Sequence, residues 1–183
     1  MRAQFPKSAR AIVSEAAFRY GEDRKAVDFI RRYWGSMLER GATTCWEHYQ
    51  ESLPKGFCAA GGISLCHGWS AGPTYSLPAH VLGVQPLEPG FAKVLVEPRP
   101  ADLVWASGEV PTPHGPVRVE WHRNSQEFRM RLRLPGDCPA KVSLPLGGPH
   151  ARVSVDGLPA VTSVEGGRVV FDVGPGEHEI LQS

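Results

Sequence analysis

The sequence predicts an α+β chain in which a helical segment precedes an antiparallel β-sandwich, with the change near residues 83–90. Two observations predict this order. Up to residue 40 the apolar residues recur at helical spacing, whereas beyond Pro86 they alternate with polar residues, as in strands with one buried face. A chain of 183 residues with 42% hydrophobic residues can also bury a real core, in one domain or two small ones.

Two amphipathic helices are expected first. The apolar residues of 7–20 fall on one helical face, and Gly21 supplies the stop. Residues 23–38 repeat the pattern, and Gly41 closes it. Because the connection between the two segments is short, they predict a helical hairpin.

A long loop and a third helix are expected next. Residues 41–68 contain glycine and proline without a sustained period, which predicts an extended loop, and loops of that length are usually functional or disordered. Pro73 suits the first turn of a helix that ends near Gly83. Pro78 should bend or shorten this helix, because proline lacks the amide donor.

Several short strands follow, separated by turns. Val117 to Trp121 and Phe128 to Leu134 show the clearest alternation. The turn signals are Pro113-His114-Gly115, Pro135-Gly136, Asp156-Gly157, Gly166-Gly167 and Gly174-Pro175-Gly176. Short strands with regular turns predict a β-sandwich. Arg129, Arg131 and Arg133 would suit a phosphate site, but their alternation with apolar residues is typical of the solvent face of a strand.

Charge and cysteine content exclude several classes of partner and cofactor. A net charge of +1 gives no field that attracts nucleic acid or acidic lipid. The first residues lack the apolar core of a signal peptide, and no apolar run is long enough to span a membrane. We therefore expect a cytoplasmic protein that does not associate with a membrane. Cys45, Cys58, Cys66 and Cys138 are expected to be reduced. Cys45 with His48, or Cys66 with His67, fits no structural zinc spacing, so no metal or other cofactor is expected.

The strongest candidate site combines Thr43-Thr44-Cys45-Trp46-Glu47 with Ser64-Leu65-Cys66-His67-Gly68-Trp69-Ser70. Indole rings stack on the apolar face of a sugar, and a partly desolvated carboxylate accepts a proton from water. The two runs therefore indicate a sugar site, although tryptophan and threonine after a glycine are also common in ordinary helix-ending loops.

These runs also carry a family resemblance. Residues 30–47, which end in Thr43-Thr44-Cys45-Trp46-Glu47, resemble the segment of bacterial α-L-rhamnosidases (glycoside hydrolase family 78) that ends in Thr-Thr-x-Trp-Glu. Residues 64–70, with 81–86 and 89–91, resemble the next element of that family, and 108–115 resemble the start of its C-terminal β domain. The elements occur in the family's order over most of the chain.

The resemblance implies a fold and a reaction. It implies that residues 1–84 are the last helices and catalytic loop of an (α/α)6 barrel, and that 85–183 are the C-terminal β-sandwich. It also implies inverting hydrolysis of a terminal α-L-rhamnosyl bond in a rhamnose-containing glycoside. Glu47 matches the family's general base and His67 the histidine that hydrogen-bonds the sugar. Trp46 and Trp69 are substrate-binding candidates, with packing beneath the motif as the alternative.

The resemblance also exposes a departure. In the family the general acid is a glutamate in an acidic, tryptophan-containing segment well before this motif, and nothing before Glu47 matches it. Glu15, Glu22 and Asp23 instead suit the solvent face of the helical hairpin. We therefore expect a piece of a glycosidase, whether a gene fragment, a remnant or part of a split enzyme, that is inactive alone.

Three readings remain open from the sequence. The first is this piece of a glycosidase. In this case the helical hairpin would turn its apolar side chains toward absent barrel helices, and these side chains are Ile12, Val13, Ile30, Tyr33 and Trp34. The chain would then bind the missing barrel portion or another copy of itself. The second is a non-catalytic carbohydrate-binding or assembly module. The third is another α-toroid hydrolase, acting on glucosides or fucosides.

Overall fold

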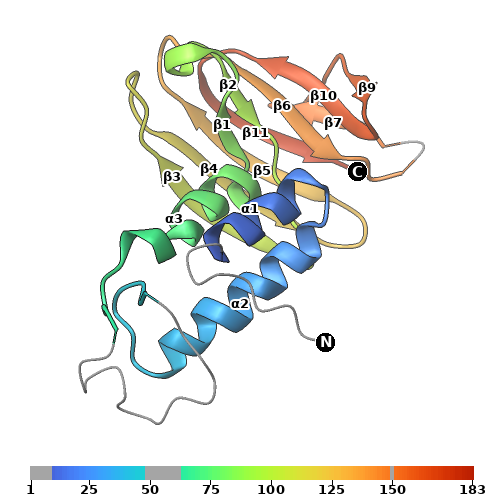
Figure 1. Cartoon of the computed structure of the whole chain (residues 1–183). Helices are drawn as coiled ribbons and strands as arrows, with labels where there is room; N and C mark the ends of the chain where they lie inside the picture. The colour runs from blue at the N-terminus through green and yellow to red at the C-terminus, as the bar shows by residue number, and fades with distance from the viewer. Residues whose placement is uncertain (1–9, 48–62, 149–150) are drawn as a thin grey trace. The chain divides into compact units, whose positions relative to one another are not determined.

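The computed structural model describes residues 10–47, 63–148 and 151–183. The chain divides into two compact units, Met1–Ser76 and Leu77–Ser183 (Figure 1). The second unit begins at Leu77, seven residues before residue 84, where the sequence places the end of the helical part. None of the described helices is both long and apolar enough to cross a membrane.

The first unit contains the predicted helical hairpin. Helices α1 (Arg10–Arg19) and α2 (Asp23–Glu39) lie side by side and are joined at Gly21, whose φ of 75° is a backbone conformation that glycine adopts without strain (Figure 1). The short helices η3 (Gly68–Ser70) and α3 (Gly72–Ser76) follow. Residues 7–9 of the first predicted helix lie outside the described residues.

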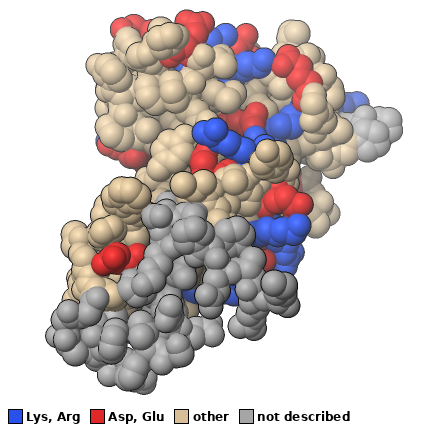
Figure 2. All heavy atoms as spheres, in the orientation of Figure 1, with Lys and Arg blue, Asp and Glu red and all other residues tan. Residues whose placement is uncertain are grey.

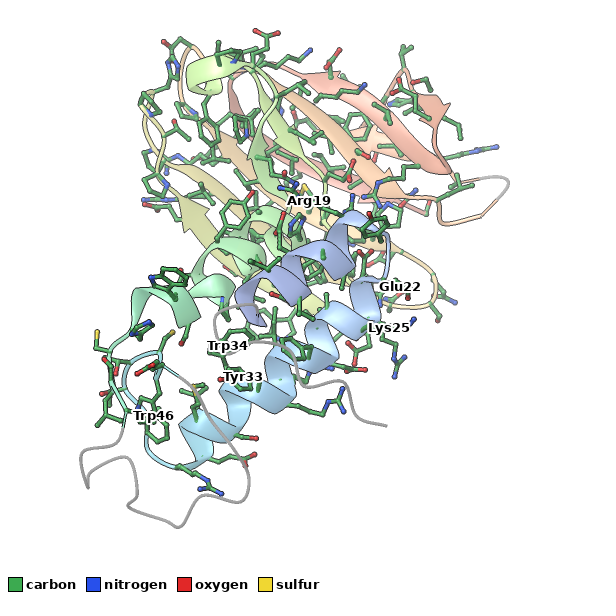
Figure 3. The ribbon with its side chains drawn as sticks, viewed as in Figure 1. Arg19, Glu22, Lys25, Tyr33, Trp34 and Trp46 are labelled. Atoms are coloured by element: carbon green, nitrogen blue, oxygen red, sulfur yellow. The ribbon has the colours of Figure 1, made fainter. Side chains whose placement is uncertain are left out.

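The expectation that this hairpin presents its apolar face outward is largely wrong. Ile30, Tyr33 and Trp34 are buried, with exposed fractions of 7–9%. Tyr33 and Trp34 form an edge-to-face pair with ring centroids 4.8 Å apart, and the face of α2 that carries them packs within the unit (Figure 3). Val13 is half-buried, and only Ile12 is exposed as expected.

The predicted third helix is divided as Pro78 suggested. Helix α3 ends at Ser76, and the next six residues, η4 (Leu77–Leu82), form a π-helix. The amide of Gly83 donates to the carbonyl of Pro78 at 3.1 Å, five residues back, which is the hydrogen-bond pattern of a π-turn. Because a proline near the start of a turn supplies no amide, the wider turn accommodates it.

The second unit is a β-sandwich of two sheets (Figure 1). In spatial order the first sheet contains β1 (Val84–Pro86), β2 (Val94–Val96), β6 (Ala140–Pro145), β10 (Arg168–Val173) and β9 (Ser163–Glu165). The second contains β3 (Trp105–Val110), β4 (Val117–Arg123), β5 (Phe128–Leu134), β11 (Gly176–Gln182), β7 (Val153–Val155) and β8 (Leu158–Pro159). The helix η5 (Pro89–Phe91) lies between β1 and β2.

The predicted antiparallel sandwich is confirmed, with one parallel pair that the sequence does not reveal. Strand β2 runs parallel to β6, with Val94 opposite Ala140. The predicted turn at Asp156-Gly157 joins β7 to β8, and both residues have positive φ (54° and 80°), as a type I′ hairpin turn requires. The α+β fold class of the whole chain is therefore confirmed.

Alternation along the strands creates the sandwich core. Strand β5 alternates buried and exposed residues along its whole length, so Met130 and Leu132 are buried while Arg129, Arg131 and Arg133 are exposed. Trp121 is fully buried, and its indole nitrogen donates to the carbonyl of Val81 at 3.0 Å. Basic and acidic side chains lie interspersed on the face of the molecule that Figure 2 shows, as expected for a net charge near zero.

Candidate functional site

The candidate site begins where α2 ends. The amide of Gly41 donates to the carbonyl of Leu38 at 2.9 Å, and the amide of Ala42 to that of Met37 at 3.0 Å. Gly41 has a φ of 85°, in the left-handed region where glycine is favoured at helix ends. The chain therefore turns away from the helix directly before Thr43 and Thr44, as the sequence predicted.

The two motif runs then lie side by side. The amide of Glu47 donates to the carbonyl of Ser64 at 2.8 Å, and the amide of His67 donates to the carbonyl of Cys45 at 2.9 Å. The Thr44 hydroxyl donates to the carbonyl of Leu65. Residues 44–47 and 64–67 are thus paired through their backbones, although neither forms a regular strand.

This pairing brings Glu47 and His67 onto adjacent segments. A carboxylate oxygen of Glu47 accepts from the amide of Ser64 at 3.1 Å, which fixes the side chain against the second segment. Glu47 and His67 are each half-buried. A carboxylate and an imidazole held this way can act together on one bound molecule, with one accepting a proton and the other forming hydrogen bonds.

The two candidate tryptophans have different environments. Trp46 is 7% exposed, and its carbonyl accepts from the buried Ser70 hydroxyl. The carbonyl of Ser70 in turn accepts from the indole nitrogen of Trp34 at 2.7 Å. Trp46 is therefore linked to α2 through Ser70 and Trp34 (Figure 3). The sequence did not predict this connecting role for either residue.

Trp69, in contrast, is 70% exposed and lies two residues after His67. An indole that is exposed beside a half-buried histidine can offer a flat apolar surface to a ligand. The burial pattern thus separates a supporting tryptophan from one that is accessible, a distinction that the sequence left undecided.

The Cys45 thiol is not activated as a nucleophile. Burial, and then the nearby Cys66 thiol, raise the pKa of Cys45, which keeps it protonated at neutral pH. Among residues 10–47, 63–148 and 151–183, no group of three or more His, Cys, Asp or Glu side chains could hold a metal ion. His48 and Cys58 lie outside the described residues.

The acidic residues of the helical hairpin are engaged locally. Glu15 forms an ion pair with Arg19 at 2.8 Å, and Glu22 pairs with Lys25 at 2.9 Å (Figure 3). Asp23 lies in the first turn of α2, where a carboxylate favours the helix dipole. Glu22 is exposed, as the sequence suggested, whereas Glu15 and Asp23 are half-buried.

Comparison with known proteins finds similarity to one group of enzymes. Residues 83–158 match the family described as bacterial alpha-L-rhamnosidase C-terminal domain. An alpha-L-rhamnosidase of Alteromonas sp. (strain LOR) is 34% identical over 59% of this chain, and one of Streptomyces avermitilis is 27% identical over 79%. The chain spans only 12% and 14% of the lengths of these two relatives.

Solved structures extend the match through the helical part. The alpha-L-rhamnosidase of Dictyoglumus thermophilum covers 97% of this chain, which corresponds to 21% of that protein, with a TM-score of 0.82 and 24% identity. The S. avermitilis enzyme complexed with L-rhamnose covers 81% of this chain and 14% of its own, with a TM-score of 0.69 and 29% identity. By family model, relatives and solved structures, this chain is similar to the C-terminal portion of bacterial α-L-rhamnosidases.

Proposed function

We propose that Glu47 and His67 form part of the catalytic site of an inverting glycoside hydrolase that removes terminal α-L-rhamnosyl residues. The observation that carries this proposal is the backbone pairing of residues 44–47 with 64–67. The pairing holds a carboxylate and an imidazole on neighbouring segments, each partly shielded from water. In this proposal Glu47 is the general base and His67 hydrogen-bonds the sugar.

The relatives support the substrate. Those reported above are named alpha-L-rhamnosidases, and one was solved as a complex with L-rhamnose. We therefore propose a rhamnose-containing glycoside as the ligand. Trp69, which is exposed beside His67, would stack on the sugar, whereas the buried Trp46 would hold Glu47 in place from beneath.

The proposed reaction requires two carboxyl groups. Inversion places them about 6.5–9.5 Å apart, so that a water fits between one carboxylate and the sugar. Glu47 would take a proton from this water as the water attacks the anomeric carbon. A carboxylic acid on the opposite side of the ring would protonate the leaving glycosidic oxygen as the bond breaks.

We place that general acid on a barrel portion outside residues 1–183. Glu15 and Glu22 are engaged by Arg19 and Lys25 on the helical hairpin, which argues against either as the acid. The working site would then form when this chain associates with the remaining barrel helices. General acid catalysis typically contributes about 10²–10⁴-fold, and positioning by the rest of the pocket contributes further.

Reconstitution tests the proposal. We expect no measurable hydrolysis of an aryl α-L-rhamnoside by the chain alone. Activity should appear when the N-terminal barrel portion of a related rhamnosidase is added. Proton NMR of the first product should show the β anomer of rhamnose, as inversion requires. Hydrolysis by the chain alone, or α-rhamnose as the first product, would contradict the assigned roles.

A further inference from the structure

The outer face of the second sheet is hollowed into an open groove. The exposed side chains of β3, β4, β5 and β11 line it, and its volume is about 650 Å³. Strand register sets the side chains in rows across the sheet: Ser107 faces Glu120, Glu120 faces Arg131, and Arg131 faces Glu179. A strand rises about 3.3 Å per residue. The groove extends along β3 from Ser107 to Glu109 and crosses to β4, β5 and β11, so it has room for an extended ligand.

Charges within the groove compensate one another. Arg118 pairs with Glu109, Arg131 with Glu179 at 3.3 Å, and Arg133 with Glu177 at 3.3 Å. A phosphate or a polyanion would have to displace these carboxylates. A neutral ligand rich in hydroxyl groups would not, because guanidinium groups donate and carboxylates accept hydrogen bonds side by side along the same rows.

An exposed tryptophan lies at one end of the same face. Trp105, the first residue of β3, is 58% exposed, and its ring stacks on His122 with centroids 6.4 Å apart and an interplanar angle of 19°. His122 Nε2 lies 3.0 Å from a carboxylate oxygen of Glu120, which holds the imidazole in place. A second hollow of about 210 Å³ adjoins this stack and is also lined by Arg129.

The Trp105 indole is accessible to a ligand. It is exposed at the first residue of β3 while its ring is held against His122. A flat ring that is fixed by a second ring offers a preformed surface, and little side-chain entropy is lost when a ligand stacks on it. The indole and the rows of paired polar groups lie on one continuous face of the sheet.

We propose that the outer face of β3, β4, β5 and β11 binds a neutral oligosaccharide, with one sugar ring stacked on Trp105 and hydroxyl groups bonded to the Arg–Glu rows. This groove belongs to the second unit, whereas Glu47 and His67 belong to the first. It would hold a polymeric substrate by a part of the chain that takes no part in bond cleavage. The choice of a rhamnose-containing glycan rests on the proposed function, whereas the groove itself does not.

Affinity electrophoresis of the full chain tests the proposal. Native gels would contain an α-linked rhamnan, which is a neutral polymer of L-rhamnose, or heparin, or no polysaccharide. We expect rhamnan to retard the chain and heparin to leave it unaffected. Trp105→Ala should raise the dissociation constant about fivefold, the order that one aromatic stacking contact contributes. Trp105→Tyr should recover most of the affinity, and Tyr20→Ala, which removes a different exposed aromatic, should be neutral.

The controls separate this site from the proposed catalytic one. His67→Ala, which should weaken sugar binding at the proposed catalytic site, should be retarded like the wild type, because the groove does not include His67. Failure of the reconstituted enzyme to hydrolyse rhamnosides would leave this result intact. Absence of retardation by rhamnan, retardation by heparin alone, or full affinity in a folded Trp105→Ala chain would each overturn the proposal. Thermal unfolding monitored by circular dichroism would confirm that the variants are folded.

Discussion

Glu47 and Ser64 are joined by two hydrogen bonds that run in opposite directions. The amide of Glu47 donates to the carbonyl of Ser64 at 2.8 Å, and the amide of Ser64 donates to the Glu47 carboxylate at 3.1 Å. Backbone and side chain of the proposed base are thus fixed by one residue of the neighbouring segment. This fixed position matters because a general base works only within hydrogen-bond reach of its water.

The first prediction concerns this carboxylate. Glu47→Gln should lower the turnover of the reconstituted enzyme by about 10²–10⁴-fold, because the amide cannot accept a proton. Rhamnose binding should persist, since the amide oxygen can still accept from Ser64. Steady-state kinetics with an aryl rhamnoside and calorimetry with L-rhamnose would measure the two effects. An active Glu47→Gln complex would show that another residue is the base.

The second prediction concerns His67. Its amide donates to Cys45, so the backbone pairing survives replacement of the side chain. His67→Ala should therefore chiefly weaken sugar binding, by about 1–3 kcal/mol if a hydrogen bond to the sugar is lost. The dissociation constant for L-rhamnose should rise, with a smaller effect on turnover. Unchanged binding together with a large loss of turnover would instead assign His67 to proton transfer.

Much of the fold was predictable because it depends on local pattern. The helical hairpin follows from apolar spacing and from the stops at Gly21 and Gly41, and the sandwich follows from alternation along β4 and β5. The motif runs were found from residue types and from resemblance. These features lie within short stretches of sequence, where periodicity reports directly on which face is buried.

Other features depended on contacts between distant residues. Nothing in the sequence indicated that Ser70 links Trp46 to Trp34, because that link depends on the three-dimensional path of the loop. The outward orientation assigned to Tyr33 and Trp34 failed for the same reason. Strand β3 was missed because its half-buried face holds small residues, such as Gly108, which the side chain of Leu82 approaches.

The third prediction tests the support beneath the site. Trp34→Phe removes the donor to the buried carbonyl of Ser70 and should destabilise the chain by about 1–3 kcal/mol. The helical signal at 222 nm, followed during urea unfolding, would report the change. Trp69→Phe is the matched control, because Trp69 is exposed and should be near neutral. Equal stability of the two variants would contradict the assigned role of Trp34.

The fourth prediction concerns acid stability. The hydrogen bond to His178, and then the amide of Glu179, lower the pKa of Asp156. The folded state favours the charged carboxylate, so Asp156 contributes to the free energy of unfolding above its unfolded pKa of about 3.9. This contribution is lost as the pH falls through the lower pKa of the folded state. Asp156→Asn should make stability less dependent on pH below about 4. Asparagine also tolerates the positive φ at this position.

Urea unfolding between about pH 2 and 5 would measure this dependence for the wild type and for Asp156→Asn. The stability of the wild type should decline more steeply toward low pH, while the two chains converge once Asp156 is protonated. Parallel curves over the whole range would show that Asp156 does not contribute through its charge.

The fifth prediction concerns the close approach at Gly83. Its φ is 91°, and an added Cβ would lie 2.3 Å from the backbone of both Glu97 and Pro98. Neither backbone can move cheaply, because the amide of Glu97 also donates to the carbonyl of Gly83 at 2.7 Å. Gly83→Ala should therefore destabilise the sandwich by about 3–5 kcal/mol, from backbone strain and overpacking together.

Gly136→Ala is the control for this prediction, because a Cβ there would meet nothing within 4 Å. Thermal unfolding should show a large fall for the first variant and little change for the second. A Gly83→Ala chain as stable as Gly136→Ala would show that β1 and the residues after β2 can separate without loss.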